Sequence, residues 1–185
     1  MIRCYITDRH TLSGATLLES IARNLQDGVT WIQLREKDLS SSDLYDLVLA
    51  AKALPNPYNS KFIVNTRADI AIAAGADGVH LPSGSPEPKR WRGIVPPGFL
   101  IGASCHTVDE LAAAQNEGAA YALFGPVFAP ISKRSTLAPH GIEGLSKAAK
   151  SVTIPVLALG GIAASNTDAC IEAGAQGIAG ISLYQ

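Results

Sequence analysis

The sequence predicts a single (β/α)8 barrel spanning residues 1–185, and three observations lead to this fold class. A glycine at the end of a helical pattern, followed closely by an apolar strand, recurs at Gly28, Gly75, Gly118 and Gly174. Each interval between these glycines has room for two strand–helix units, so the whole chain holds eight. Short β-branched runs lie within the intervals, as expected of parallel strands covered by helices.

Eight strands are expected in chain order. Four of them follow the recurring glycines directly, namely Trp31–Leu34, Val79–Leu81, Tyr121–Phe124 and Ile178–Ile181. The other four are the intervening runs Ile2–Thr7, Lys61–Val64, Leu100–Ser104 and Pro155–Leu159. Each run has the length and the β-branched, apolar character of a buried parallel strand.

Helical patterns separate these strands. The expected helices are Ala15–Gln26, Ser41–Ala53, a short Arg67–Ala73, Thr107–Asn116, Ile142–Lys150 and Ala164–Glu172. Polar caps are expected at 41–43, and at Thr107 with Glu110 three residues later. Only residues 182–185 follow the last strand, so the eighth helix is expected to be truncated or missing. The flank of the barrel there is either open or covered by the second subunit of a homodimer.

Composition excludes several classes of function. The chain is 47% hydrophobic and 17% charged, and its net charge is −1, so no broad basic surface favours nucleic acid. No apolar run has the length of a membrane span. Cys4, Cys105 and Cys170 are far apart and form neither a zinc motif nor a disulfide framework. We therefore expect a cytoplasmic protein that acts without nucleic acid or membrane, on a small-molecule ligand.

Polar side chains are concentrated where the second strand ends, within residues 31–38. Because side chains alternate along a strand, Gln33, Arg35 and Lys37 share one side and Ile32 and Leu34 the other. An amide, a guanidinium and an ammonium together supply many N–H donors. Taken alone, the segment is more typical of a solvated loop with compensating charges. At the carboxyl end of a barrel strand, where active sites lie, it indicates a binding site for phosphate or diphosphate.

A second anion site is expected after the last two strands. Gly160 and Gly161 follow the seventh strand, and Ile181 and Ser182 end the eighth. Barrel enzymes often bind phosphate at this place through backbone N–H groups, and glycine lets the main chain approach an anion closely. A tight strand-to-helix turn is the alternative explanation, and it accounts for one glycine more readily than for two.

Several motifs, taken in order along the chain, resemble the thiamine phosphate synthase/TenI superfamily. They are the segments 33–38, 74–81, 101–104, 124–128, 160–162 and 181–182, together with Asn65 and Lys133. The resemblance extends from Ile2 to Ser182. It implies a (β/α)8 barrel of thiamine biosynthesis. Synthases of this family join a hydroxymethylpyrimidine diphosphate to a thiazole phosphate and release pyrophosphate, whereas TenI-type tautomerases isomerise a carboxythiazole phosphate.

The resemblance also implies roles for individual residues. The pyrimidine diphosphate would contact Gln33, Arg35, Lys37, Asn65, Ser104 and Lys133. The thiazole phosphate would contact Gly161, Ile181 and Ser182. Gly160 and Ser132 adjoin these positions and complete the expected set of substrate-binding residues.

Two departures from the synthase pattern concern Mg²⁺. Synthases of this family usually carry one Asp next to the Asn after the third strand and another in the loop after the fourth, and these hold the metal. Thr66 and Ser85 occupy those places here. Mg²⁺ prefers anionic oxygen ligands, so no metal site is expected from the protein alone, and Mg²⁺ is expected only if synthase activity is retained.

One departure concerns the tautomerase. Its His after the Phe-Gly of the sixth strand is replaced by Pro126, which cannot carry a proton. The candidate catalytic residues are therefore His106, Lys133 and Ser104. His140 ends the loop 135–140, which is a candidate to fold over the site. A TenI-like protein that binds a thiazole phosphate is the first expectation, with a tautomerase reaction left open. A thiamine phosphate synthase that recruits Mg²⁺ mainly through the diphosphate is the second, and a non-catalytic phosphate-binding or regulatory barrel is the third.

Overall fold

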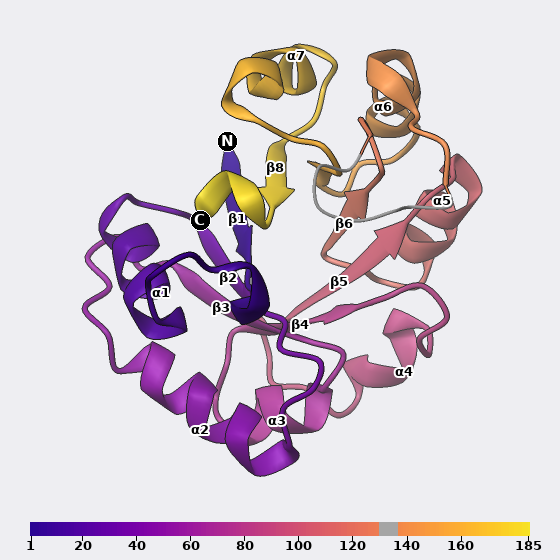
Figure 1. The fold of residues 1–185 in the computed structure, drawn as a ribbon. Helices are drawn as coiled ribbons and strands as arrows, with labels where there is room; N and C mark the ends of the chain where they lie inside the picture. The colour runs from indigo at the N-terminus through magenta and orange to yellow at the C-terminus, as the bar shows by residue number, and fades with distance from the viewer. Residues whose placement is uncertain (130–136) are drawn as a thin grey trace.

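A computed structural model of the chain confirms the predicted barrel. The structure describes residues 1–129 and 137–185. Eight parallel strands pair in chain order and close into a barrel, β8 pairing with β1 (Figure 1). They are β1 (Ile2–Ile6), β2 (Trp31–Leu34), β3 (Lys61–Asn65), β4 (Gly78–Leu81), β5 (Leu100–Cys105), β6 (Tyr121–Phe124), β7 (Val156–Leu159) and β8 (Gly177–Gly180).

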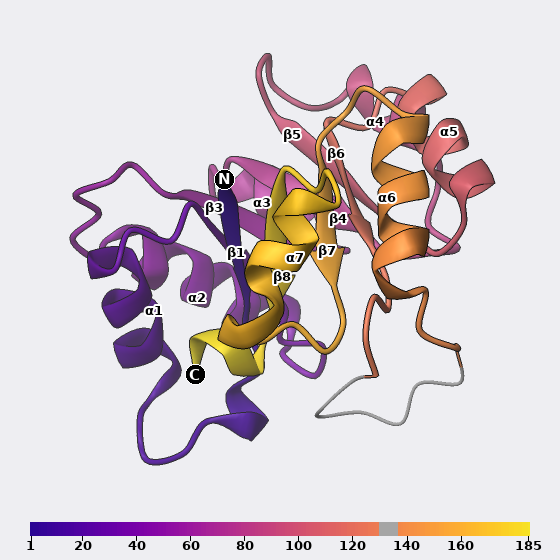
Figure 2. The ribbon, with the colours of Figure 1, turned by 90° about the horizontal axis from the view of Figure 1, so that it is seen from above.

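Helices surround the strands on the outside of the barrel (Figures 1 and 2). They are α1 (Leu17–Gln26), α2 (Ser41–Lys52), α3 (Ala68–Ala73), α4 (Pro88–Arg92), α5 (Val108–Asn116), α6 (Gly141–Ser151) and α7 (Thr167–Glu172). The recurring glycines at 28, 75, 118 and 174 all have positive φ just after a helix, which confirms their predicted conformation. No helix within the described ranges is both long and apolar enough to cross a bilayer.

The expected helix boundaries need three corrections. The helix α4 was not expected in the proline-rich segment, yet Pro88 begins it, a position where proline loses no helical hydrogen bond. The helix expected over 164–172 is instead a 3-10 turn followed by α7, because the Asn166 amide bonds Ala163 N–H and the Gly161 carbonyl. Ser40, not the segment 41–43, supplies the cap of α2. The cap at Thr107 is confirmed.

After β8 the chain forms only a 3-10 helix, Ser182–Tyr184. Tyr184 is buried, and its ring lies 5.8 Å from that of Tyr5 on β1. Its carbonyl oxygen accepts hydrogen bonds from Arg23 and Asn24 of α1. Figure 2 shows this segment beside α1. The final residues therefore pack against α1, and no full eighth helix follows β8, as expected.

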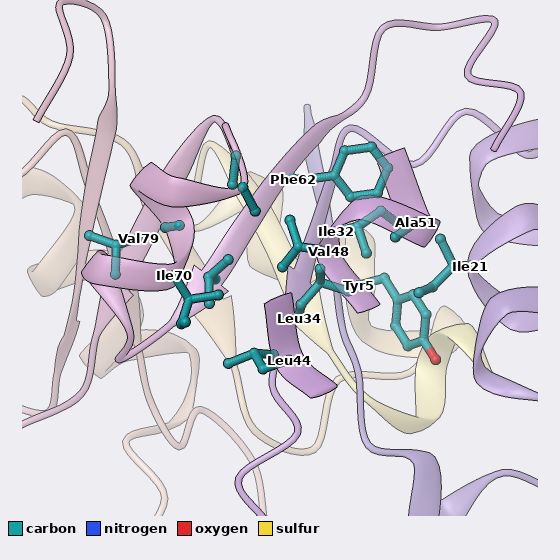
Figure 3. Packing of buried hydrophobic residues seen from close by; sticks show 14 of the residues in the cluster. Tyr5, Ile21, Ile32, Leu34, Leu44, Val48, Ala51, Phe62, Ile70 and Val79 are labelled. Atoms are coloured by element: carbon teal, nitrogen blue, oxygen red, sulfur yellow. The ribbon is translucent and has the colours of Figure 1, made fainter. Parts of the chain in front are cut away.

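Two apolar layers account for the stability of the barrel. Outward-facing side chains such as Tyr5, Ile32 and Phe62 pack against Ile21 and Val48 of the helices (Figure 3). Inward-facing side chains fill the barrel itself; they include Cys4, Ile6, Trp31, Ile63, Tyr121, Leu123, Leu157 and Ala179. This alternation is the period of two that a strand imposes, and at the carboxyl ends it turns polar side chains inward.

Tyr121 and Trp31 form an aromatic pair inside the barrel. The ring of Tyr121 lies 4.7 Å from that of Trp31, and the tyrosine side chain is fully buried. The ring occupies the space beside Gly102 on the neighbouring strand β5, where an added Cβ would lie 2.0 Å from Tyr121 Cζ. Glycine is therefore required at 102 so that the tyrosine fits.

We predict that Gly102→Ala destabilises the barrel strongly, because neither the buried ring nor the strand can move away. Overpacking of a core costs about 1–3 kcal/mol, and we expect the upper end of that range here. Gly93→Ala is the matched control, since an added Cβ at that exposed position has no atom within 4 Å. Urea denaturation should show a loss only for the first variant. Equal stability of the two variants would contradict the packing described.

Candidate functional site

The main cavity of the described part of the chain opens at the carboxyl ends of the strands and has a volume of about 540 Å³. The strand ends contribute polar residues to it, and the barrel interior contributes apolar ones. Most of the predicted site residues line it, namely Gln33, Arg35, Lys37, Asn65, Ser104, His106, Gly160, Gly161, Ile181 and Ser182. Ser132 and Lys133 lie outside the described residues.

The cationic side of the cavity lies at β2 and β3. Gln33 is the last inward residue of β2, and its side-chain NH₂ group is buried without an acceptor in the described part of the chain. Arg35 follows the strand; its backbone N–H donates to Thr7 Oγ1 over 2.9 Å, and its guanidinium lies 3.9 Å from Asp8. This side therefore presents N–H donors to the cavity, as predicted from the alternation along the strand.

The segment that carries Arg35 and Lys37 is tied to the segment after β1. Arg9 binds both carboxylate oxygens of Asp38 at 2.8 and 2.6 Å, and donates to buried Glu36 over 3.0 Å. Hydrogen bonds from Arg9 to Asp38 hold the pKa of that carboxyl at about 2, so the pair is charged at neutral pH. The two acidic residues next to Arg35 and Lys37 in the sequence, Glu36 and Asp38, are thus both paired with Arg9.

His80, on β4, is more deeply placed than its position in the sequence indicates. Its ring is 2% exposed and bonds on both sides, with Nε2 2.8 Å from Ser104 Oγ and Nδ1 3.2 Å from Tyr121 Oη. Burial lowers the pKa of His80 to about 3, and the charge of Arg35 adds to this, so the ring is neutral at physiological pH. The histidine is a hydrogen-bonded interior residue.

His106 is the second imidazole of the site and lines the cavity at the end of β5. Its Nδ1 is hydrogen-bonded to the Gly125 carbonyl, which can only accept, so Nδ1 carries the proton. Nε2 is then the acceptor in the neutral ring. His140, the residue that was a candidate to fold over the site, does not line the cavity. Its ring centroid instead lies 4.7 Å from that of Phe124.

The glycines after β7 have a packing role. Gly160 and Gly161 both have positive φ. An added Cβ would lie 2.7 Å from Pro126 Cα at the first and 2.5 Å from the Ala129 carbonyl oxygen at the second. A tight turn therefore explains both glycines, contrary to the expectation that it accounts for only one. The turn still lines the cavity together with Ile181, which follows β8, and Ser182, the first residue of the 3-10 helix.

Sequence reasoning did not select three kinds of residue that the barrel brings to the site. Tyr121 has the pattern of a core residue, and its contact with His80 depends on strand register. Ile6, Leu123, Leu159 and Ala179 form an apolar lining between the two polar sides. Pro82 and Ser83 border the cavity after β4. For the residues within the strands, the inward direction of the side chain follows from the strand period once the ends of the strands are known.

The arrangement of the acidic, histidine and cysteine side chains bears on whether the protein itself could hold a metal ion. Among the described residues, no group of three or more His, Cys, Asp or Glu side chains lies close enough to hold an ion. No carboxylate lines the main cavity, and the sequence of residues 130–136 contains neither Asp nor Glu. Thr66 and Ser85 do not line it either.

The sequence matches the family described as thiamine monophosphate synthase (TMP-TENI) over residues 3–183. A putative thiamine-phosphate synthase of Geobacter sulfurreducens is 43% identical over 96% of this chain and 83% of its own. The putative thiamine-phosphate synthase 2 of Aquifex aeolicus is 40% identical over 97% of this chain and 95% of its own. Among solved structures, thiamine phosphate pyrophosphorylase of Pyrococcus furiosus superposes with a TM-score of 0.85 at 36% identity, covering 98% of this chain and 86% of that one.

The neutral state of His80 predicts how stability depends on pH. The pKa of histidine is 6.5 in the unfolded chain and about 3 in the folded one, so only the unfolded chain gains this proton in between. The free energy of unfolding should therefore fall as the pH drops below 6.5, by roughly 2 kcal/mol between pH 6.5 and 5 from this group. Urea denaturation of wild type and His80→Gln at both pH values isolates the term. An equal fall in the two proteins would show that His80 titrates normally.

Proposed function

Because the chain belongs to the thiamine monophosphate synthase/TenI family, we propose that it catalyses the synthase reaction, joining a hydroxymethylpyrimidine diphosphate to a thiazole phosphate. The proposed transfer breaks the bond between the pyrimidine methylene carbon and the diphosphate oxygen. A bond from the thiazole nitrogen to that carbon forms, and pyrophosphate leaves with the electron pair. This favours the second expectation from the sequence over the first, since the relatives compared above carry synthase names.

The observation that carries the proposal is the division of the cavity into two polar sides. Arg35 and Lys37 lie at the end of β2, whereas the turn after β7 and the end of β8 lie on the other side of β1. Apolar side chains between them suit the faces of two heterocycles. A cavity of about 540 Å³ is in the range that encloses ligands of this size.

The protein's own cations are the groups that favour departure of the diphosphate. Negative charge grows on the diphosphate as the bond breaks, and Arg35 with Lys37 would stabilise it by charge-assisted hydrogen bonds. Gln33 adds a buried NH₂ donor. Asn65 and Ser104 adjoin this group in the cavity wall.

The residues present do not fit a protein-held Mg²⁺ ion. That ion prefers several hard, anionic oxygen ligands, and the described part of the cavity wall offers cations, amides and hydroxyls but no carboxylate. Thr66 also has φ of 68°, a conformation that a β-branched residue adopts with strain and that Asp tolerates better. The backbone at position 66 therefore suits an acidic residue, but the threonine there does not supply a carboxylate to coordinate the ion.

The missing carboxylates favour a second candidate function, a TenI-type isomerisation of a carboxythiazole phosphate. In that reaction His106, whose Nε2 is an acceptor, would take and return the proton, although Pro126 occupies the usual position of the base. Incubation with the carboxythiazole phosphate alone distinguishes the two reactions. Binding of both substrates without any turnover would instead support a non-catalytic phosphate-binding barrel.

The proposal predicts thiamine phosphate and pyrophosphate in equal amounts when purified protein is given both substrates. Arg35→Gln should lower kcat about 10²–10³-fold, as expected for loss of one group that stabilises developing negative charge. Arg67→Gln is the matched control, because that arginine pairs with Asp69 and does not line the main cavity. A wild-type protein that forms no thiamine phosphate under any metal condition would exclude the synthase reaction.

Installing the two absent carboxylates should create dependence on Mg²⁺. We expect Thr66→Asp with Ser85→Asp to raise turnover in the presence of Mg²⁺, and chelation to abolish the gain but not the basal rate. Thr66→Asp alone should not destabilise the fold, because Asp suits the positive φ. Chelation that abolishes turnover of the wild-type protein would show that its reaction already depends on the ion, and would contradict this prediction.

A further inference from the structure

Three polar side chains form a continuous hydrogen-bonded row from the barrel interior to the cavity. Tyr121 of β6 lies deepest and is 0% exposed, His80 of β4 is in the middle, and Ser104 of β5 lines the cavity. The His80 ring is 3.2 Å from Tyr121 Oη and 2.8 Å from Ser104 Oγ. Gly102 makes the row possible because only glycine leaves space for the tyrosine ring.

The direction of these hydrogen bonds is decided by counting protons. A neutral imidazole has one N–H donor and one acceptor, so His80 donates to one neighbour and accepts from the other. If His80 donated to Tyr121, the tyrosine would keep its own hydrogen, and no other acceptor for it exists in the described part of the chain. A buried donor without a partner costs free energy comparable to a lost hydrogen bond, or more.

The opposite direction leaves no buried hydrogen without a partner. Tyr121 then donates to His80 Nδ1, and His80 Nε2–H donates to Ser104 Oγ. The Ser104 oxygen has accepted one hydrogen bond, and its own hydrogen is available for a group in the cavity. Ser83 Oγ contacts only the Ser104 backbone carbonyl, so it does not compete for that hydrogen.

We infer that Tyr121 and His80 are positioning residues that make the Ser104 hydroxyl a hydrogen-bond donor, so that it selects an acceptor oxygen of an anionic phosphoryl group. The identity of that group as the diphosphate rests on the proposed function. Arg35 lines the same cavity, and its charge acts in the same sense as the hydroxyl donor. With the reverse direction Ser104 would favour a ligand N–H instead.

The tautomer of His80 tests the row in the ligand-free protein. Long-range ¹H–¹⁵N correlation spectra of histidine-labelled protein distinguish the two neutral tautomers, and His80→Gln assigns the signal. We expect Nε2 to carry the hydrogen and Nδ1 to be unprotonated at neutral pH. A proton on Nδ1, or an imidazolium, would overturn the inference.

Binding of inorganic pyrophosphate tests the consequence for the ligand. Ser104→Ala should weaken binding measured by calorimetry roughly tenfold to a hundredfold, the usual worth of a hydrogen bond to a charged group. His80→Asn, whose amide is too short to reach Ser104, should cost severalfold, whereas His80→Gln keeps an N–H there and should bind like wild type. In the Ser104→Ala background His80→Asn should have no further effect.

The results separate the positioning role from a structural one and from the proposed function. An effect of His80→Asn that persists in the Ser104→Ala background would show that His80 acts on the fold, and would overturn the inference. A proton on Nδ1 with pyrophosphate still bound would overturn it while leaving the synthase proposal intact. Absence of pyrophosphate binding, with Nε2 protonated, would instead remove the diphosphate and with it the synthase proposal, and would leave the direction of the row established.

Discussion

The contact between the Tyr121 ring and Gly102 is the constraint on which the site depends. A closed barrel has a small interior, and a tyrosine fits there only because the adjacent strand has no side chain at 102. The fitted ring fixes the depth of His80, and His80 in turn contacts Ser104 at the cavity wall. Packing in the interior thus determines which polar atoms face the ligand. This is the ordinary consequence of dense packing, in which one buried side chain restricts its neighbours.

The charges at the carboxyl ends of the strands depend on a second feature, the ion pairs that Arg9 forms with two acidic residues. Arg9 neutralises Asp38 and contacts Glu36, and both acidic residues belong to the segment that carries Arg35 and Lys37. The acidic groups of the segment are therefore engaged with Arg9, while Arg35 and Lys37 face the cavity. A site without carboxylates in its described wall is suited to an anion. Thr66 and Ser85, in place of two acidic residues, are expected to reduce the dependence of the reaction on Mg²⁺. They leave the cations that would bind the anion in place.

The sequence was sufficient for the fold because the helix-exit glycines recur with the period of a double strand–helix unit. The alternation along residues 31–38 was sufficient for the cationic side, since a period of two fixes which side chains share a face. The Tyr121–His80–Ser104 row could not be predicted, because it joins three strands through their register. Gly160 and Gly161 are the opposite case: packing alone requires both glycines, so their presence in the sequence is not by itself evidence for an anion site. The expectation for His140 failed because its stacking on Phe124 depends on the placement of α6.

A crystal structure with pyrophosphate and the thiazole phosphate bound is the most direct measurement of the central claim, that the two polar sides of one cavity receive two phosphorylated ligands. The account predicts pyrophosphate between Arg35, Lys37 and the Ser104 hydroxyl, with the thiazole phosphate at the turn after β7 and the end of β8. Density for pyrophosphate away from Arg35 and Ser104, or for both anions on the same side of the barrel, would contradict it.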